Sequence, residues 1–250
     1  MSKLGFFLSK KVGKAICDFK MLQDGDRVAV GVSGGRDSLS LLKILEERRR
    51  IVPIKYSVLA VHLDMGYGCI HSGKMQKFFE ENGYEYYIKK INILDTVKGD
   101  RSKIDCFWCS WNRRKHLFEA AIKHKCNKLA LGHHMDDIAH TLLLNLFFRG
   151  EFSSMAPTQE MFNGKIHIIR PLAYAGEKEL GQFASESKFP LACCKCPNAG
   201  KNNRVLMRQI VERVEKVCPH VKVNLFRSLC QDERFLKGYR DKAKRKKIYK

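Results

Sequence analysis

The chain has 250 residues, of which 44% are hydrophobic, so it can bury a substantial core as one domain or as one domain with an appendage. Its formal net charge of +21 favours a polyanionic partner, either nucleic acid or an anionic membrane surface. No apolar run approaches the roughly 18 residues that a membrane span needs, and the N-terminus turns basic too soon for a signal peptide. These features exclude a membrane-spanning protein and predict a cytoplasmic one.

The first expected elements are a helix and a buried strand. Residues 1–24 form a leading segment, and within it residues 4–22 alternate apolar and basic positions, which is typical of an amphipathic helix. Its apolar side chains are expected to face the body of the protein: Phe7, Val12, Ile16, Phe19 and Leu22. The next run favours a strand in the middle of a parallel sheet, because β-branched residues alternate along it: Val28, Val30 and Val32.

A glycine turn, residues 33–38 (Ser-Gly-Gly-Arg-Asp-Ser), follows this strand, and leucines at helical spacing come next. Backbone N–H groups and the positive end of the helix would meet there, so the turn predicts an anion site. It lacks the Walker A spacing but has the Ser-Gly-Gly-x-Asp-Ser signature of the PP-loop ATP pyrophosphatases. The alternative is a turn whose Ser and Asp only cap the helix. The nucleotide is expected to contact these residues: Val30, Ser33, Gly34, Gly35, Arg36, Asp37 and Ser38.

Two more strands are expected to end beside this turn. A buried strand over residues 56–63 leads to His62 and Asp64, and a strand over residues 128–131 leads to Gly132 and His133. Ligands of open parallel sheets bind at the carboxyl ends of the strands, so these four residues should lie near the nucleotide. For His62, an ordinary histidine at a strand end is the alternative.

The alternation of strands and helices predicts the fold class. A helix over residues 72–82, a strand over 84–91, a helix from 106 and a helix ending near 148 complete the pattern. Each β–turn–α unit carries polar residues in its turn. We therefore expect an α/β fold with a doubly wound parallel sheet in a domain of residues 25–190.

The remaining elements form the C-terminal part. A loop over residues 151–165, a strand over 166–170 and a helix over 177–188 are expected to finish the main domain. Residues 191–230 would hold a cysteine-rich turn and two helices. Nine of the last seventeen residues are Lys or Arg, against one Asp, so residues 231–250 are interpreted as a mobile basic tail.

Two clusters could hold metals. Asp136 and Asp137 follow His133 and His134, and adjacent carboxylates beside a triphosphate are suitable Mg²⁺ ligands; a plain helix cap is the alternative. Ten cysteines in a cytoplasmic chain indicate metal, cluster or thiol chemistry rather than disulfides. Cys106-x-x-Cys109 fits zinc, a redox dithiol or an iron–sulfur cluster, with candidate partners in three cysteines further along the chain: Cys193, Cys194 and Cys196.

Three stretches together resemble the tRNA 2-thiocytidine synthetases, the TtcA branch of the PP-loop tRNA thiolases. They are residues 33–38, residues 106–114 with 132–150 (GHHMDDIAHTLLLNLFFRG), and residues 170–189 (RPLAYAGEKELGQFASESKF). The resemblance implies a Rossmann-like domain of the adenine nucleotide alpha hydrolase type, flanked by N- and C-terminal helices. It also implies ATP, Mg²⁺, a three-cysteine [4Fe–4S] cluster and a tRNA substrate. The sulfur donor would be a cysteine desulfurase or free sulfide. Whether the protein forms a homodimer is left open by the resemblance.

The resemblance also suggests roles for single residues. Cys106 and Cys109 would be two cluster ligands, and Cys196, which precedes a proline, the third. Arg113 falls where such thiolases carry a basic residue beside the cluster, and Asp137 where they carry an acidic catalytic residue.

Two departures from the family pattern matter. Position 36 is Arg where the family usually has Lys, and it should contact phosphate with fork geometry. The Cys-Cys-Lys-Cys run leaves the third cluster ligand open between Cys196 and Cys194.

The implied reaction is ATP-dependent sulfuration of tRNA, forming 2-thiocytidine at position 32 of the anticodon loop. The base would be adenylated with release of pyrophosphate, and cluster-bound sulfur would then displace AMP. A loop target is favoured because the base must be unstacked. The alternatives are another PP-loop enzyme, forming 2-thiouridine or resembling lysidine synthetase, and a non-catalytic zinc-bearing RNA-binding module.

Overall fold

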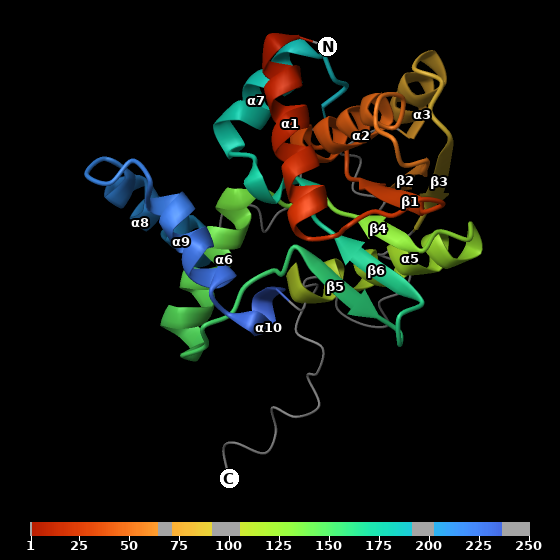
Figure 1. Cartoon of the computed structure of the whole chain (residues 1–250). Helices are drawn as coiled ribbons and strands as arrows, with labels where there is room; N and C mark the ends of the chain where they lie inside the picture. The colour runs from red at the N-terminus through yellow and green to blue at the C-terminus, as the bar shows by residue number, and fades with distance from the viewer. Residues whose placement is uncertain (1, 65–71, 92–105, 192–202, 237–250) are drawn as a thin grey trace.

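A six-stranded sheet forms the centre of the molecule (Figure 1). The computed structural model describes residues 2–64, 72–91, 106–191 and 203–236. The strand order is β3-β2-β1-β4-β6-β5, and every pair is parallel except β5 with β6. The strands are β1 Arg27–Val32, β2 Ser57–Asp64, β3 Tyr86–Lys90, β4 Lys128–Ala130, β5 Thr158–Met161 and β6 Ile166–Ile169.

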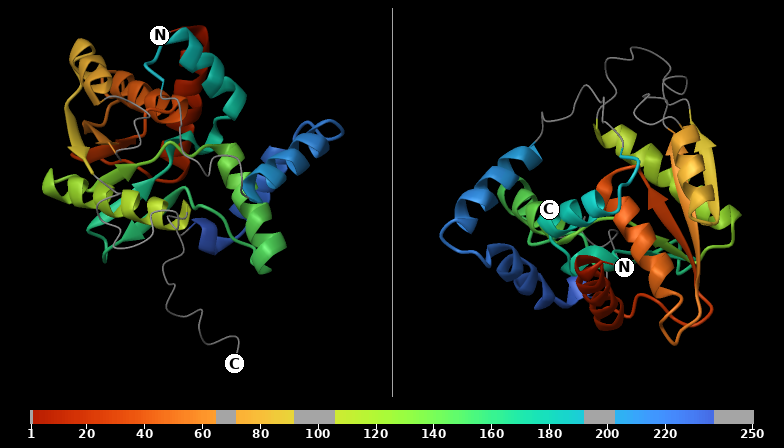
Figure 2. Two further views of the ribbon diagram at one scale, coloured as in Figure 1. Left: turned by 180° about the vertical axis from the view of Figure 1, so that it is seen from behind. Right: turned by 90° about the horizontal axis from the view of Figure 1, so that it is seen from above.

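Helices cover both faces of this sheet. One face packs against α1, α2 and α7 through a large apolar cluster, and the other face packs against α5 through a second cluster (Figures 1 and 2). The predicted doubly wound α/β fold is thereby confirmed. The helices are α1 Lys3–Asp18, α2 Arg36–Arg48, α3 Ser72–Glu81, α5 Cys106–Lys123, α6 Met135–Arg149, α7 Glu177–Glu186, α8 Asn203–Glu215, α9 Val221–Cys230, α10 Glu233–Leu236 and the 3₁₀ helix η2 Pro171–Tyr174.

Two expectations for residues 1–190 were wrong. The predicted loop over residues 151–165 contains β5, whose short polar sequence Thr-Gln-Glu-Met carries no alternation and becomes a strand by pairing antiparallel with β6. In the leading helix, Phe7 was expected to face inward but is 51% exposed, and Leu8 is buried in its place. The expected inward positions Val12 and Ile16 are buried, so most of the predicted face is confirmed.

The C-terminal helices pack on α6 through a third apolar cluster, which includes Phe226 and Leu229 of α9. Phe235 falls inside the predicted tail, yet it is fully buried, with its ring centroid 5.9 Å from that of Phe226. The folded body thus extends through α10. The cysteine-rich turn over 192–202 and the basic residues 237–250 lie outside the described residues. Among the helices that are described, none combines the length and apolar character that crossing a membrane requires.

Candidate active site

The turn between β1 and α2 has the geometry that its sequence predicts. Gly34 has φ +81°, a left-handed conformation that glycine adopts without strain. The Ser38 hydroxyl accepts a hydrogen bond from the Ser33 N–H (3.1 Å) and donates one to the Gly35 carbonyl (2.9 Å), which closes the turn. Gly35 is the N-cap of α2 and provides no side-chain cap. No side chain of the N-cap therefore occupies the first N–H groups of α2, and these groups are available to bind an anion.

The turn after β4 touches the turn after β1, because the two strands are neighbours in the sheet. A Cβ atom on Gly132 would lie 3.0 Å from the Ser38 nitrogen and 3.1 Å from the Asp37 carbonyl carbon. This is tighter than nine in ten real Cβ contacts, so a larger residue would push the two turns apart by a few tenths of an ångström. Gly132 therefore belongs to the site through backbone packing.

Three carboxylates surround the buried His134. Its Nε2 atom lies 3.5 Å from Asp137 Oδ2 and 3.9 Å from Asp37 Oδ2, and its Nδ1 lies 3.5 Å from Asp136 Oδ2. Burial alone would lower the pKa of His134, but the contact with Asp136 and the charges of Asp137 and Asp37 raise it above the ordinary value. The imidazole thus balances part of the negative charge at the strand ends.

Asp37 and Asp137 offer oxygens to a cation. The buried Asp37 Oδ1 has no hydrogen-bond partner in the described part of the chain, and burial raises the pKa of this carboxyl. Asp137 is half-buried and accepts a hydrogen bond from the His134 N–H at 3.2 Å. A buried carboxylate oxygen that accepts no hydrogen bond fits Mg²⁺, which binds one or two carboxylates together with phosphate.

Asp136 differs from the expectation that it faces a metal. Its Oδ1 pairs with Lys222 Nζ of α9 at 2.8 Å, and its Oδ2 accepts the Glu177 N–H at the start of α7 at 2.9 Å. Although burial opposes it, contacts with His134 and Lys222 hold the pKa of Asp136 below its usual range. Both oxygens are engaged, so Asp136 anchors α7 and α9 to α6, and its predicted Mg²⁺ contact stays untested.

Arg36 extends from the turn toward α7. Its guanidinium pairs with Glu177, lies 3.6 Å from Asp37 Oδ1, and passes 3.4 Å from the position of a Cβ on Gly181. The same Glu177 receives two hydrogen bonds from Arg208 of α8, at 2.9 and 3.0 Å. A planar guanidinium has several N–H groups and can contact two carboxylates at once, as Arg36 does with Asp37 and Glu177, better than a point charge could. Arg36 therefore has a partner on α7.

Of the other predicted nucleotide contacts, two are buried in the sheet and one lies at its edge. Val30 is fully buried inside the sheet, so its side chain belongs to the core. His62 is also buried, with Nδ1 2.8 Å from the Val32 carbonyl oxygen, and burial lowers its pKa. This contact supports the residue that precedes the turn, which favours the structural interpretation of His62. Asp64 ends β2 at the same edge of the sheet and is half-buried.

The predicted cluster residues are only partly described. Cys106 and Cys109 stand three residues apart in the first turn of α5, Cys109 is half-buried, and Arg113 is exposed one turn further along. Cys193, Cys194 and Cys196 lie outside the described residues, so the third ligand stays a prediction.

Comparison with known proteins identifies the family. Residues 8–214 match the model of the PP-loop domain. The chain is 42% identical over 222 residues to the tRNA-cytidine(32) 2-sulfurtransferase of Geobacter metallireducens, covering 87% of this chain and 86% of that protein. The corresponding protein of Geobacter sulfurreducens is 42% identical over 226 residues, or 89% and 88% of the two chains. The chain belongs to the tRNA-cytidine(32) 2-sulfurtransferase family of PP-loop proteins.

A solved structure agrees with this assignment. The U34-tRNA thiolase NcsA from Methanococcus maripaludis, determined with its [4Fe-4S] cluster, superposes on this PP-loop protein with a TM-score of 0.73. The two are 27% identical, and the match covers 94% of this chain and 79% of NcsA. The family that the sequence resemblance predicts is thus confirmed.

The sequence predicts no role for several residues of this PP-loop site. Glu177, Lys222 and Arg208 reach the site from three helices that lie far from residues 33–38 along the chain. Arg170 and Glu177 fall within the third stretch of the family resemblance, although that pattern assigns them no role. A sequence pattern reports local periodicity, and these contacts depend on how distant elements cross.

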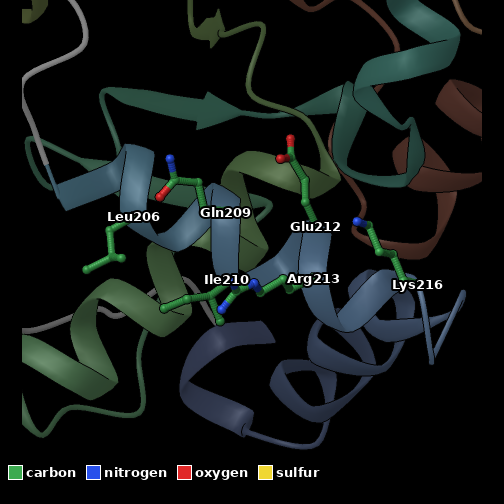
Figure 3. Close-up of a pocket in the computed structure, with 6 residues that line it drawn as sticks. All are labelled: Leu206, Gln209, Ile210, Glu212, Arg213 and Lys216. Atoms are coloured by element: carbon green, nitrogen blue, oxygen red, sulfur yellow. The ribbon is translucent and has the colours of Figure 1, made fainter.

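A groove of about 420 Å³ lies elsewhere, along α8 (Figure 3). It contains none of the residues that the sequence predicts for the site. Its lining combines aliphatic and charged side chains: Leu206, Gln209, Ile210, Glu212, Arg213 and Lys216.

Proposed function

We propose that this PP-loop protein catalyses ATP-dependent transfer of sulfur to a tRNA base and forms 2-thiocytidine at position 32. One observation carries the proposal most directly. The uncapped N-terminus of α2 and the carboxylates of Asp37 and Asp137 converge on one sheet edge, in a chain 42% identical to proteins named for this reaction. A cytoplasmic location fits a protein that modifies tRNA.

The first step would activate the base. The first N–H groups of α2 would bind phosphate oxygens, and Asp37 with Asp137 would hold a Mg²⁺ ion, which when bound supplies positive charge for the leaving pyrophosphate. The C2 oxygen of cytidine attacks the α-phosphorus, the bond from that phosphorus to the bridging oxygen of pyrophosphate breaks, and the base becomes adenylated. The protein contributes position and electrostatic stabilisation.

The second step would exchange oxygen for sulfur. A sulfide sulfur forms a bond to C2, and the C2–O bond breaks with AMP as the leaving group. Cys106 and Cys109 would hold a [4Fe–4S] cluster together with Cys196 or Cys194; when bound, such a cluster supplies an iron site for sulfide. The sulfide would come from a cysteine desulfurase or from solution, and the active protein could be a homodimer.

The decisive experiment is nucleoside mass spectrometry of tRNA from a strain that lacks this gene. We expect 2-thiocytidine to disappear, to return with the intact gene, and to stay absent with a Cys106→Ala copy. Loss of 2-thiouridine instead would assign a different base. Restoration of 2-thiocytidine by Cys106→Ala would refute the role of Cys106 in sulfur transfer. Loss of a lysidine-type nucleoside in place of a thiolated one would indicate amine attachment, which needs no cysteine.

Iron content tests the cluster. Protein purified without oxygen should hold about four iron atoms per chain, because three cysteines can retain a [4Fe–4S] cluster. Cys196→Ala should reduce the iron content strongly, whereas Cys218→Ala, on a cysteine outside the motif, should not. Loss of iron in Cys194→Ala but not in Cys196→Ala would identify Cys194 as the third cluster ligand instead of Cys196. Stoichiometric zinc without iron would contradict the cluster.

Salt dependence tests the basic tail. Truncation after Leu236 removes the Lys- and Arg-rich end but keeps the buried Phe235. Each phosphate that the tail neutralises contributes about 0.7 to 0.9 to the slope of log affinity against log salt. We expect the truncated protein to bind every tRNA more weakly and with a shallower slope, measured by filter binding at several salt concentrations. An unchanged slope would show that the tail makes no phosphate contacts.

A further inference from the structure

Arg170 carries a buried positive charge at the edge of the sheet. It follows β6 and is only 5% exposed. Its Nη1 donates to the Ala156 carbonyl, and its Nε donates to Nδ1 of His133 at 3.3 Å. Within the described ranges, no carboxylate pairs with this guanidinium, and burial, aided by the charge of Arg114, lowers its pKa to about 10. A buried charge without an opposite charge is costly, which points to a role in binding.

The Arg170 contact determines the tautomer of His133. A guanidinium has only donors, so Nδ1 of His133 must accept and cannot carry the proton. Burial and the positive charges of Arg170, Arg204 and Arg114, with a small contribution from His134, lower the pKa of His133 to about 3. The ring is therefore neutral at pH 7, and its one proton lies on Nε2.

The position of His133 places this donor near the phosphate turn. His133 follows Gly132, which touches the backbone of Asp37 and Ser38. β6, which leads to Arg170, lies beside β4, which leads to His133. His133 is half-buried, so part of it remains accessible, whereas Arg170 is buried. The surrounding arginine charges favour an anion at this place.

We propose that His133 and Arg170 form a phosphate-binding site, in which His133 donates its Nε2–H to an anionic phosphate oxygen and Arg170 fixes that tautomer. The proposal rests on the proposed function, because it places the site beside the nucleotide turn. The ligand is a phosphate group, either of the ATP triphosphate or of a tRNA phosphodiester next to the target base. Arg170 is a positioning residue, and His133 is the residue that touches the phosphate.

Binding measurements on the full chain distinguish the two sources. His133→Ala should weaken binding of one ligand about 10- to 100-fold, the loss expected for one hydrogen bond to a charged group. His133→Gln should retain most of the affinity, since its amide can place an N–H near the Nε2 position. A loss for Mg–ATP alone assigns the triphosphate, and a loss for tRNA alone assigns a phosphodiester.

The positioning role has its own variants and control. Arg170→Met should weaken the same ligand as His133→Ala, although the altered residue does not touch it. His116→Gln, on a histidine bonded to Glu119 on α5, should bind both ligands normally. Thermal unfolding of each variant verifies the fold. Unchanged affinity of His133→Ala for both ligands would overturn the proposal, even if 2-thiocytidine formation is confirmed.

Nitrogen NMR of the His133 ring provides a readout that needs no reaction. In the intact protein, Nε2 should be protonated and the ring should stay neutral from pH 8 to about 5, below the ordinary histidine pKa of about 6.5. Adding inorganic pyrophosphate or a short RNA should shift the Nε2 resonance. In Arg170→Met the tautomers should mix and the pKa should rise. A proton on Nδ1 in the intact protein would refute the assignment, whether or not the protein thiolates tRNA.

Discussion

Replacing Asp137 with Asn should reduce ATP-dependent pyrophosphate release about 100-fold or more. Asn lacks the carboxylate charge that would hold Mg²⁺, and loss of the bound Mg²⁺ removes several kcal/mol of transition-state stabilisation. The Asn side chain can still accept the hydrogen bond that Asp137 receives from the His134 N–H, so the helix cap is kept while the negative charge is lost. The measurement is pyrophosphate release in the presence of substrate tRNA. Normal release by Asp137→Asn would mean that this carboxylate acts only as a cap.

A matched variant separates activation from sulfur transfer. Cys109→Ala leaves the turn and its carboxylates intact, so it should still bind ATP and retain part of the pyrophosphate release while losing 2-thiocytidine formation. Asp137→Asn should show the reverse, keeping its iron while losing adenylation. If Cys109→Ala still forms 2-thiocytidine, Cys109 has only a structural role.

Replacing Lys222 with Met should destabilise the protein by about 3–5 kcal/mol, the cost of leaving a buried charge without its partner. Lys222 Nζ lies 2.8 Å from Asp136 Oδ1 and 3.1 Å from Glu215 Oε2, and the Asp136 side chain is only 3% exposed. The free energy of unfolding from urea titration measures the effect. Lys14→Met is the matched control: its pair with Asp18 is exposed, so it should change stability by less than about 1 kcal/mol.

A double variant and a pH series test the cause. Asp136→Asn with Lys222→Met removes both charges and should recover much of the lost stability. The pKa of Asp136 is lower in the folded than in the unfolded protein, so its stabilisation is present above the ordinary carboxyl pKa of 3.8 and is lost as the pH falls below it. Lys222→Met should reduce that loss. Equal stability of the single variant and the intact protein would refute the anchoring role.

The anchor also connects the C-terminal helices to the nucleotide edge. Lys222 lies in the first turn of α9. Asp136 lies in the first turn of α6 and accepts the N–H of Glu177, which in turn pairs with Arg36. The position of Arg36 therefore depends on residues more than 140 places further along the chain. Residues outside the two motifs at 33–38 and 133–137 therefore help to position the side chains of the site.

The sequence alone determined the local features of this protein. The alternating valines of β1, the glycines of residues 33–38 and the leucines of α2 predict strand, turn and helix, because each depends on neighbouring residues. The repeated β–turn–α pattern is sufficient for the doubly wound sheet, and the motif combination is sufficient for the family. β5 was missed because its four residues are a strand only through pairing with β6.

Only the tertiary structure decided which side chains meet. The sequence treats Asp136 and Asp137 as equivalent metal ligands, but successive residues of a helix point about 100° apart. One carboxylate therefore turns inward to Lys222 and the other stays at the accessible edge. Arg170 likewise meets His133 because β4 and β6 are neighbours in the sheet, although 37 positions separate them in the chain. Such pairings follow from the crossing of elements, which no local periodicity encodes.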